Sequence, residues 1–202
     1  TLRMESCNMS EHMALENLTV LDLTRVLAGP FCTMMLADMG ANVIKIEVPK
    51  GGDDTRSYPP FRAKNLNGER ESVYFANINR NKKGITLNLK APEGKEIFKE
   101  LVKKADIVVE NYRPGVMDKL GLGYDVLKEI NPRIIYAAVS GFGCYGPYHL
   151  RPGYDILAQA MGGMMSITGS KGGEPTRAGS ALGDILGGLH VTIGILAAVN
   201  AR

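Results

Sequence analysis

A single carboxylate, Asp184, stands within a stretch of small and apolar residues at 178–190, AGSALGDILGGLH. The nearest cationic residue in the sequence is Arg177. Apolar residues recur at helical spacing after Asp184, which places it at or near the N-terminus of a predicted helix. Free N–H groups and the helix dipole stabilise an anion there, and covalent carboxylate catalysis needs an ionised carboxylate with open space before it. Taken alone, these residues favour a simple helix cap, because caps far outnumber nucleophiles.

The composition is that of an ordinary globular protein, with 45% hydrophobic and 22% charged residues among 202. This length is enough for one sizeable domain with its own core. The net charge of +3 does not indicate nucleic-acid binding, although it suits a small anionic ligand. The cysteines, Cys7, Cys32 and Cys144, are odd in number and widely spaced. We therefore expect free thiols in a reducing compartment, the cytoplasm or the mitochondrial matrix, and no metal site.

The two ends of the chain predict neither an export signal nor a membrane anchor. Residues 1–15 are expected to form a tail without the apolar run of a signal peptide, and residues 16–202 to form one domain. Residues 181–199 are apolar enough to suggest a membrane span, but Asp184, His190 and several glycines favour a buried helix instead. Because the helical pattern continues to Arg202 without a stop signal, we expect the chain to be truncated before a further domain.

Short apolar runs alternate with helical patterns along the chain. Such alternation predicts an α/β fold with a mainly parallel, Rossmann-like sheet and helices on both faces. Ligands of these sheets bind beyond the carboxyl ends of the strands, so the turns after Leu23, Glu110 and Val139 form the candidate site. The predicted strands are 18–23, 42–47, 84–89, 105–110 and 134–139.

The sequence at 141–146, GFGCYG, matches the GxGxxG pattern of dinucleotide-binding proteins and follows a predicted strand. Two features argue against a nicotinamide dehydrogenase. Pro147 follows immediately, where the fingerprint should open a helix, and no acidic residue stands about twenty positions further on, where the ribose contact belongs. We expect these glycines to form a mobile wall near the sheet edge instead.

Six motifs in order along the chain together resemble the class III coenzyme A (CoA) transferases, a family that includes formyl-CoA transferase, carnitine CoA-transferase and an α-methylacyl-CoA racemase branch. The resemblance runs from about residue 15 to residue 202. One such motif is weak evidence, whereas six in sequence are specific. They imply a Rossmann-like CoA-binding domain. The motifs are DLTRVLAGP at 22–30, GANVIKIE at 40–47, NRNKK at 79–83, ENYRPG at 110–115, RPGYD at 151–155 and LGD at 182–184.

The resemblance implies that Asp184 is the catalytic nucleophile. In the family this carboxylate attacks the thioester of an acyl-CoA, which gives an aspartyl mixed anhydride and then an aspartyl-CoA thioester, from which an acid acceptor takes the CoA. The implied substrates are an acyl-CoA and a small carboxylic acid, for example succinyl-CoA and a dicarboxylate. No prosthetic group is implied.

The same resemblance implies ten CoA contacts. Lys90, Arg113 and Lys119 have side chains that bind phosphates, although ordinary surface charge remains an alternative for each of them. Asn111 lies at the end of a predicted strand, where ligands bind. The implied contacts are Leu27, Ala28, Leu87, Lys90, Asn111, Tyr112, Arg113, Lys119, Tyr154 and Asp155.

Three positions depart from the family's patterns. Leu27 replaces a glutamine of formyl-CoA transferase, so specificity for formate and oxalate does not carry over. Val48 stands where a basic CoA contact is expected, with Lys50 as the candidate replacement. Tyr154 stands where the racemases carry a proton-transferring histidine. Because the ordinary pKa of tyrosine is about 10, a transferase is favoured over a racemase.

Members of the family continue into a small domain, carry a glycine-rich loop there, and pair as interlocked rings. We therefore expect a homodimer if the full chain is present. Two alternatives to a CoA-transferase stay open from the residues. They are an acyl-CoA racemase of the same family and a non-catalytic CoA-binding fragment.

Overall fold

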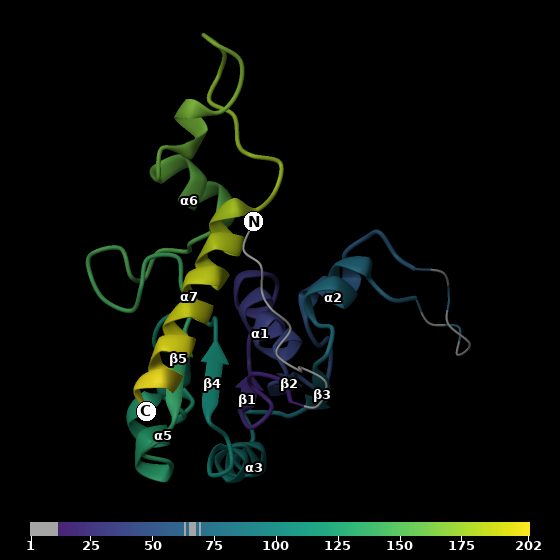
Figure 1. Ribbon diagram of the computed structural model, residues 1–202, viewed down its shortest axis with the longest axis vertical. Coiled ribbons are helices and arrows are strands. Elements are labelled where there is room, and N and C mark those ends of the chain that lie inside the picture. The colour runs from purple at the N-terminus through teal and green to yellow at the C-terminus, as the bar shows by residue number, and fades with distance from the viewer. Residues whose placement is uncertain (1–11, 63, 65–67, 69) are drawn as a thin grey trace.

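The computed structural model describes residues 12–62, 64, 68 and 70–202 (Figure 1). Cys7 and most of the predicted tail lie outside these residues. Five parallel strands form one sheet in the order β3-β2-β1-β4-β5, which confirms the predicted α/β fold with a parallel, Rossmann-like sheet. The strands are β1 (Thr19–Asp22), β2 (Asn42–Glu47), β3 (Lys83–Thr86), β4 (Ile107–Glu110) and β5 (Ile135–Ala138).

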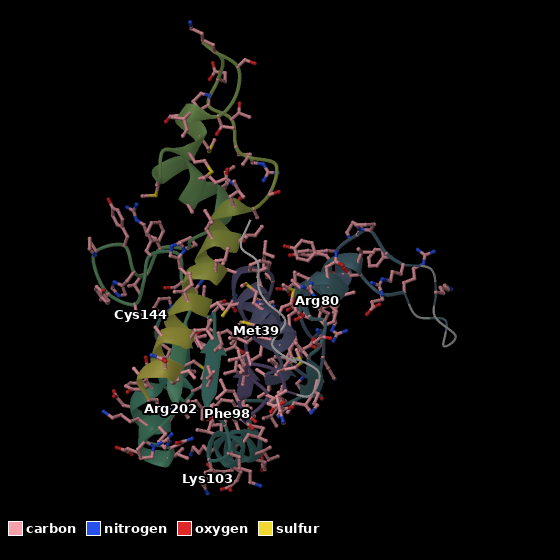
Figure 2. All side chains as sticks on the ribbon, viewed as in Figure 1. Met39, Arg80, Phe98, Lys103, Cys144 and Arg202 are labelled. Carbon is pink, nitrogen blue, oxygen red and sulfur yellow. The ribbon has the colours of Figure 1, made fainter. Side chains whose placement is uncertain are left out.

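Alternate residues of each strand point to opposite faces of the sheet, and each face carries its own hydrophobic cluster. On one face, Val20 and Ile107 pack with helices α1 (Ala28–Asp38) and α7 (Leu182–Ala201). On the other face, Leu21 packs with α3 (Pro92–Val102) and α5 (Tyr124–Ile130). Figure 2 shows Phe98, which is fully buried, where α3 meets the sheet. The apolar segments of the sequence therefore form strands, because helices cover both faces of the sheet.

Several short helices extend beyond the carboxyl ends of the strands. Figure 1 shows α6 above the sheet, next to the N-terminal end of α7. The carboxyl ends of the strands are therefore flanked by helices that are distant in sequence. The remaining elements are η1 (Asp54–Ser57), α2 (Val73–Ile78), α4 (Val116–Lys119), α6 (Asp155–Met161) and η2 (Met164–Ile167).

The strand predicted at 84–89 is shorter and more exposed than expected. β3 ends at Thr86, and its four residues are exposed because it is the edge strand next to β2. Leu87 and Leu89 lie after the strand and pack against the core. The apolar residues in the second half of the alternating pattern therefore contact the core after the strand has ended.

Helix α7 is only partly buried, so the prediction of a buried helix at 181–199 is wrong for one of its faces. Gly188 and Ile195 are buried, whereas Leu186 and Ile193 are 43% and 59% exposed. In the described part of the chain, α7 is the one helix long and apolar enough to cross a membrane. Length and composition alone are weak evidence for a span. The helix packs along α1 and also contacts β5 and α6.

The GFGCYG stretch opens no helix. Residues 141–146 begin a loop that leaves the end of β5 and returns at Gly153, which agrees with the rejection of the dinucleotide fingerprint. Gly141 and Gly153 meet at the neck of this loop, where a Cβ on either residue would lie 2.2 Å from the Cα of the other. Cys144 lies on the loop, away from the sheet (Figure 2), and its thiol is exposed and free.

Candidate active site

A cavity of about 410 Å³ lies beyond the carboxyl ends of β1, β4 and β5, and this volume is typical of small-molecule sites. The turns after these three strands line it, as the topology predicted. The segment at 151–154, helix α6 and the first turns of α7 complete the wall, with Asp184 on the α7 side. The cavity thus joins the sheet edge to the carboxylate singled out in the sequence.

Asp184 lies within the first turn of α7, and it is not the cap of this helix. The cap residue is Ala181, which makes no side-chain cap bond, so the interpretation of Asp184 as a simple cap is wrong. Burial raises the pKa of Asp184, and the negative charge of Asp155 raises it further. No hydrogen bond or ion pair within the described residues engages its carboxylate. A half-buried carboxylate without a partner is available as a nucleophile or base.

Asp155 provides the hydrogen bond to the start of α7 that a cap would make. Its Oδ1 accepts from the N–H of Gly183 at 2.8 Å, and its Oδ2 accepts from Nε2 of Gln159 at 2.8 Å. Gln159 is buried and also binds the backbone at Ala178 and Ser180. The Asp155 carboxylate, predicted to contact CoA, is therefore used between two helices and does not line the cavity.

The turn after β1 is held in a strained conformation. Val26 has a φ of 68°, a left-handed backbone that costs a β-branched residue on the order of 1–3 kcal/mol. Its N–H donates to Oδ1 of Asp53 at 3.3 Å. Nζ of Lys45 donates to Oδ2 of Asp53 and to the carbonyl of Thr24, both at 2.9 Å. These contacts hold the turn that brings Leu27 to the cavity.

Two buried ion pairs lie beneath this turn. Lys45 and Asp53 are 2.9 Å apart, Lys82 and Asp22 are 3.0 Å apart, and all four side chains are at most 2% exposed. Burial alone would raise the pKa of each carboxyl. The lysine charges and the hydrogen bonds to threonine hydroxyls outweigh burial and hold the pKa values of Asp22 and Asp53 below the ordinary value. Lys82, from the NRNKK motif, therefore serves the interior of the fold.

The structure brings seven of the eleven predicted site residues to the cavity. Leu87 packs against the core, and Lys90 and Lys119 are exposed outside the cavity. Asn111 lines the cavity, but its amide also binds the backbone N–H and carbonyl of Arg25. The seven residues are Leu27, Ala28, Asn111, Tyr112, Arg113, Tyr154 and Asp184.

Sequence reasoning missed three polar side chains of the cavity, Arg25, Ser140 and Arg151. Arg25 and Ser140 follow strand ends already assigned to the site, so their place in the topology was an available signal. Tyr74 of α2 does not line the cavity. Burial raises the pKa of Tyr74, and the negative charge of Asp184 raises it further.

The model of CoA-transferase family III matches residues 15–202. The chain belongs to this family. It is 52% identical over 196 residues to an acyl-CoA transferase of Fusarium pseudograminearum and 50% identical over 188 residues to an acetyl-CoA:oxalate CoA-transferase of Acetobacter aceti. It is 48% identical over 191 residues to a succinyl-CoA:glutarate CoA-transferase of Homo sapiens. These matches cover 96%, 93% and 94% of the chain, but 43%, 47% and 42% of the relatives.

Solved structures of the family have the same fold. A CAIB/BAIF family protein from Brucella suis matches with a TM-score of 0.89 and 46% identity, over 94% of the chain and 50% of that protein. Rv3272 from Mycobacterium tuberculosis matches with a TM-score of 0.85 and 36% identity, over 94% of the chain and 52% of that protein. The chain thus spans about half the length of the relatives it matches, and the family resemblance of its six motifs is confirmed.

Proposed function

We propose that the protein transfers CoA from an acyl-CoA donor to a carboxylic acid acceptor, with Asp184 as the attacking carboxylate. The observation that carries the proposal is the place of Asp184, an unpaired, half-buried carboxylate in the first turn of α7 that faces a cavity at the carboxyl ends of the sheet. The printed names of the relatives, which specify acyl-CoA donors and acid acceptors, support this class of reaction.

The proposed reaction proceeds through two kinds of acyl-enzyme. The Asp184 carboxylate attacks the thioester carbonyl, which forms a mixed anhydride and releases CoA thiolate. The thiolate attacks the aspartyl carbonyl of the anhydride, which forms an aspartyl-CoA thioester and releases the donor acid. The acceptor carboxylate then attacks this thioester, which forms a new anhydride and releases CoA thiolate, and the thiolate attacks the acceptor's acyl carbonyl of this anhydride. The products are the acceptor's CoA thioester and the free Asp184 carboxylate.

The cavity suits these steps in charge and polarity. Asp184 lies in the first turn of α7, where the positive end of the helix dipole favours the ionised, nucleophilic form of its carboxylate. Arg113 and Arg151 line the cavity and suit the phosphates of CoA. Leu157 and Met161 offer an apolar wall to the acyl and pantetheine chains. Tyr154, in place of a proton-transferring histidine, favours transfer over racemisation.

We propose a dicarboxylate as the acceptor and succinyl-CoA as the donor. Support comes from the relatives named as succinyl-CoA:glutarate and succinyl-CoA:mesaconate CoA-transferases. Leu27, an apolar residue at the cavity, offers no hydrogen bond to formate or oxalate. A longer dicarboxylate therefore fits this wall better than either of these small acids.

We further propose that α7 is covered in the complete protein, as part of an interlocked homodimer. Its exposed residues include the large apolar side chains of Leu186 and Ile193, and exposed apolar surface of this kind marks an interaction site. The matched relatives are about twice as long as the chain, so additional polypeptide of the same protein is the proposed cover.

Intact-protein mass spectrometry after incubation with succinyl-CoA, with and without hydroxylamine, tests the nucleophile. We expect a covalent adduct on the full-length protein that peptide mapping places on Asp184 and that Asp184→Asn lacks. Asp125→Asn is the matched control, because Asp125 lies in the first turn of α5, away from the cavity. An adduct that persists in Asp184→Asn, or turnover by this variant, would refute the mechanism.

A further inference from the structure

Two polar atoms on the cavity wall lack a protein partner. Nε of Arg25 and Oγ of Ser140 are buried, and neither makes a hydrogen bond to any of the described residues. Both residues line the cavity that Asp184 faces. Buried donors are seldom left unpaired in folded proteins, so a pair of them on one cavity wall indicates a group supplied by a ligand.

Arg25 and Ser140 both lie just beyond the carboxyl end of a strand that pairs with β4. Arg25 follows β1, Ser140 follows β5, and both strands pair with β4, so Asn111 at the end of β4 stands between them. Neighbouring strands lie about 4.8 Å apart, so the ends of β1 and β5 are separated by roughly 10 Å, a gap that an arginine side chain and a small ligand group together can bridge. The two residues therefore lie at the same carboxyl edge of the sheet, on the wall of one cavity.

Arg25 is held rigidly at this place. Oδ1 of Asn111 accepts from the N–H of Arg25 at 2.8 Å, and Nδ2 of Asn111 donates to its carbonyl at 2.7 Å. Nη2 of Arg25 donates to Oδ2 of Asp54 at 2.6 Å, which orients the guanidinium from its outer side. The backbone and one end of the side chain are thus engaged, while Nε makes no hydrogen bond to the described residues. Such preorganisation lowers the entropic cost of binding a ligand.

We infer that Arg25 and Ser140 form a binding subsite for an oxyanion of the substrate, an inference that rests on the proposed CoA transfer. A guanidinium bound in this way favours planar oxyanions, and a serine hydroxyl donates to the same acceptor. The described cavity wall carries Arg25, Arg113 and Arg151 against the one carboxylate of Asp184, so its charge suits an anion. The oxyanion is either the carboxylate of the acid or a phosphate of CoA.

Calorimetric titration and steady-state kinetics of the full-length protein test the subsite with Arg25→Met, Arg25→Lys and Ser140→Ala. The ligands are CoA, pantetheine, glutarate and butyrate. A lost hydrogen bond to a charged group weakens binding about 10- to 100-fold. If the subsite holds a phosphate, the Kd of CoA rises by this factor and that of pantetheine does not. If it holds a carboxylate, the KM of glutarate rises relative to that of butyrate, and the Kd of CoA is unchanged. Either result supports the inference.

Arg133→Met is the matched control, because Arg133 is exposed and precedes β5 at the opposite edge of the sheet. Changes below twofold in all three variants, equal to those of Arg133→Met, would overturn the inference. If Arg25→Met does not fold, as judged by circular dichroism, the same criterion applies to Arg25→Lys and Ser140→Ala. A wild-type protein that binds CoA but transfers none would contradict the proposed transfer, while the binding data would still decide on the subsite.

Discussion

Replacement of Lys45 by methionine should destabilise the protein strongly. Lys45 is 2% exposed, and its Nζ donates to the Thr24 carbonyl and to Oδ2 of Asp53, which is 0% exposed. Methionine keeps most of the side-chain length but leaves the Asp53 carboxylate buried without its cation. Loss of one partner of a buried ion pair costs about 3–5 kcal/mol, and at roughly 2–4 °C per kcal/mol the melting temperature should fall by about 6–20 °C.

Equilibrium urea unfolding of the wild-type and variant proteins measures this cost. Lys99→Met is the control, because Lys99 forms a surface pair with Glu96 that is worth only about 0.5 kcal/mol. The double variant Lys45→Met/Asp53→Asn should recover a large part of the loss, since it removes the uncompensated charge. A loss below about 1 kcal/mol for Lys45→Met, or a double variant no more stable than Lys45→Met, would refute the reasoning.

The pH dependence of the same variant has a definite sign. Burial would raise the pKa of Asp53, but the charge of Lys45 and the hydrogen bonds of Lys45 and Thr55 hold it below the ordinary value. A depressed pKa in the folded state stabilises the protein above the pKa of the unfolded chain, about 3.9, and this stability is lost as the pH falls through the folded pKa. The difference in stability between wild type and Lys45→Met should therefore narrow below about pH 4.

Three further predictions follow from the site. Burial raises the pKa of Asp184, so its ionised form is unfavourable in the fold. Asp184→Asn should therefore raise the melting temperature at neutral pH, with a gain that shrinks as the pH falls through the raised folded pKa and is gone below the unfolded pKa of about 3.9. Gln159→Leu should cost about 1–3 kcal/mol in urea unfolding, because the Asp155 carboxylate and the backbone at Ala178 and Ser180 lose a hydrogen-bond partner, and should slow transfer. Gly188→Ala should cost about 1–3 kcal/mol, because its Cβ would lie 2.5 Å from the carbonyl oxygen of Ala28, whereas Gly194→Ala, with nothing within 4 Å, should stabilise α7.

Local sequence patterns predicted much of the architecture. The β-branched runs at 18–23, 42–47 and 105–110 form β1, β2 and β4, because strands covered on both faces need a continuous apolar sequence. The parallel order of the sheet then places the turns after β1, β4 and β5 at one edge. This reasoning located the cavity, and the apolar periodicity after Asp184 located the start of α7 to within a few residues.

Predictions failed where exposure depends on neighbours that a local pattern does not reveal. The apolar stretch at 181–199 forms a helix with one exposed face, because among the described elements its main contacts are with α1, β5 and α6. The alternating stretch at 84–89 forms an exposed edge strand, because only β2 pairs with it in the described sheet. Periodicity identifies an apolar face, whereas the position of the element in the fold decides what covers it.

The sequence by itself determined the α/β fold, the edge of the sheet where the cavity lies, and Asp184 as the candidate nucleophile. Only the tertiary structure decided which polar side chains remain available to a ligand. Asp155 is bound to Gly183, 28 residues away, Lys82 to Asp22, 60 residues away, and Asn111 to Arg25, 86 residues away. A hydrogen bond between such distant residues forms only when packing brings them together. The same packing leaves the Asp184 carboxylate at the cavity without a hydrogen-bond partner among the described residues.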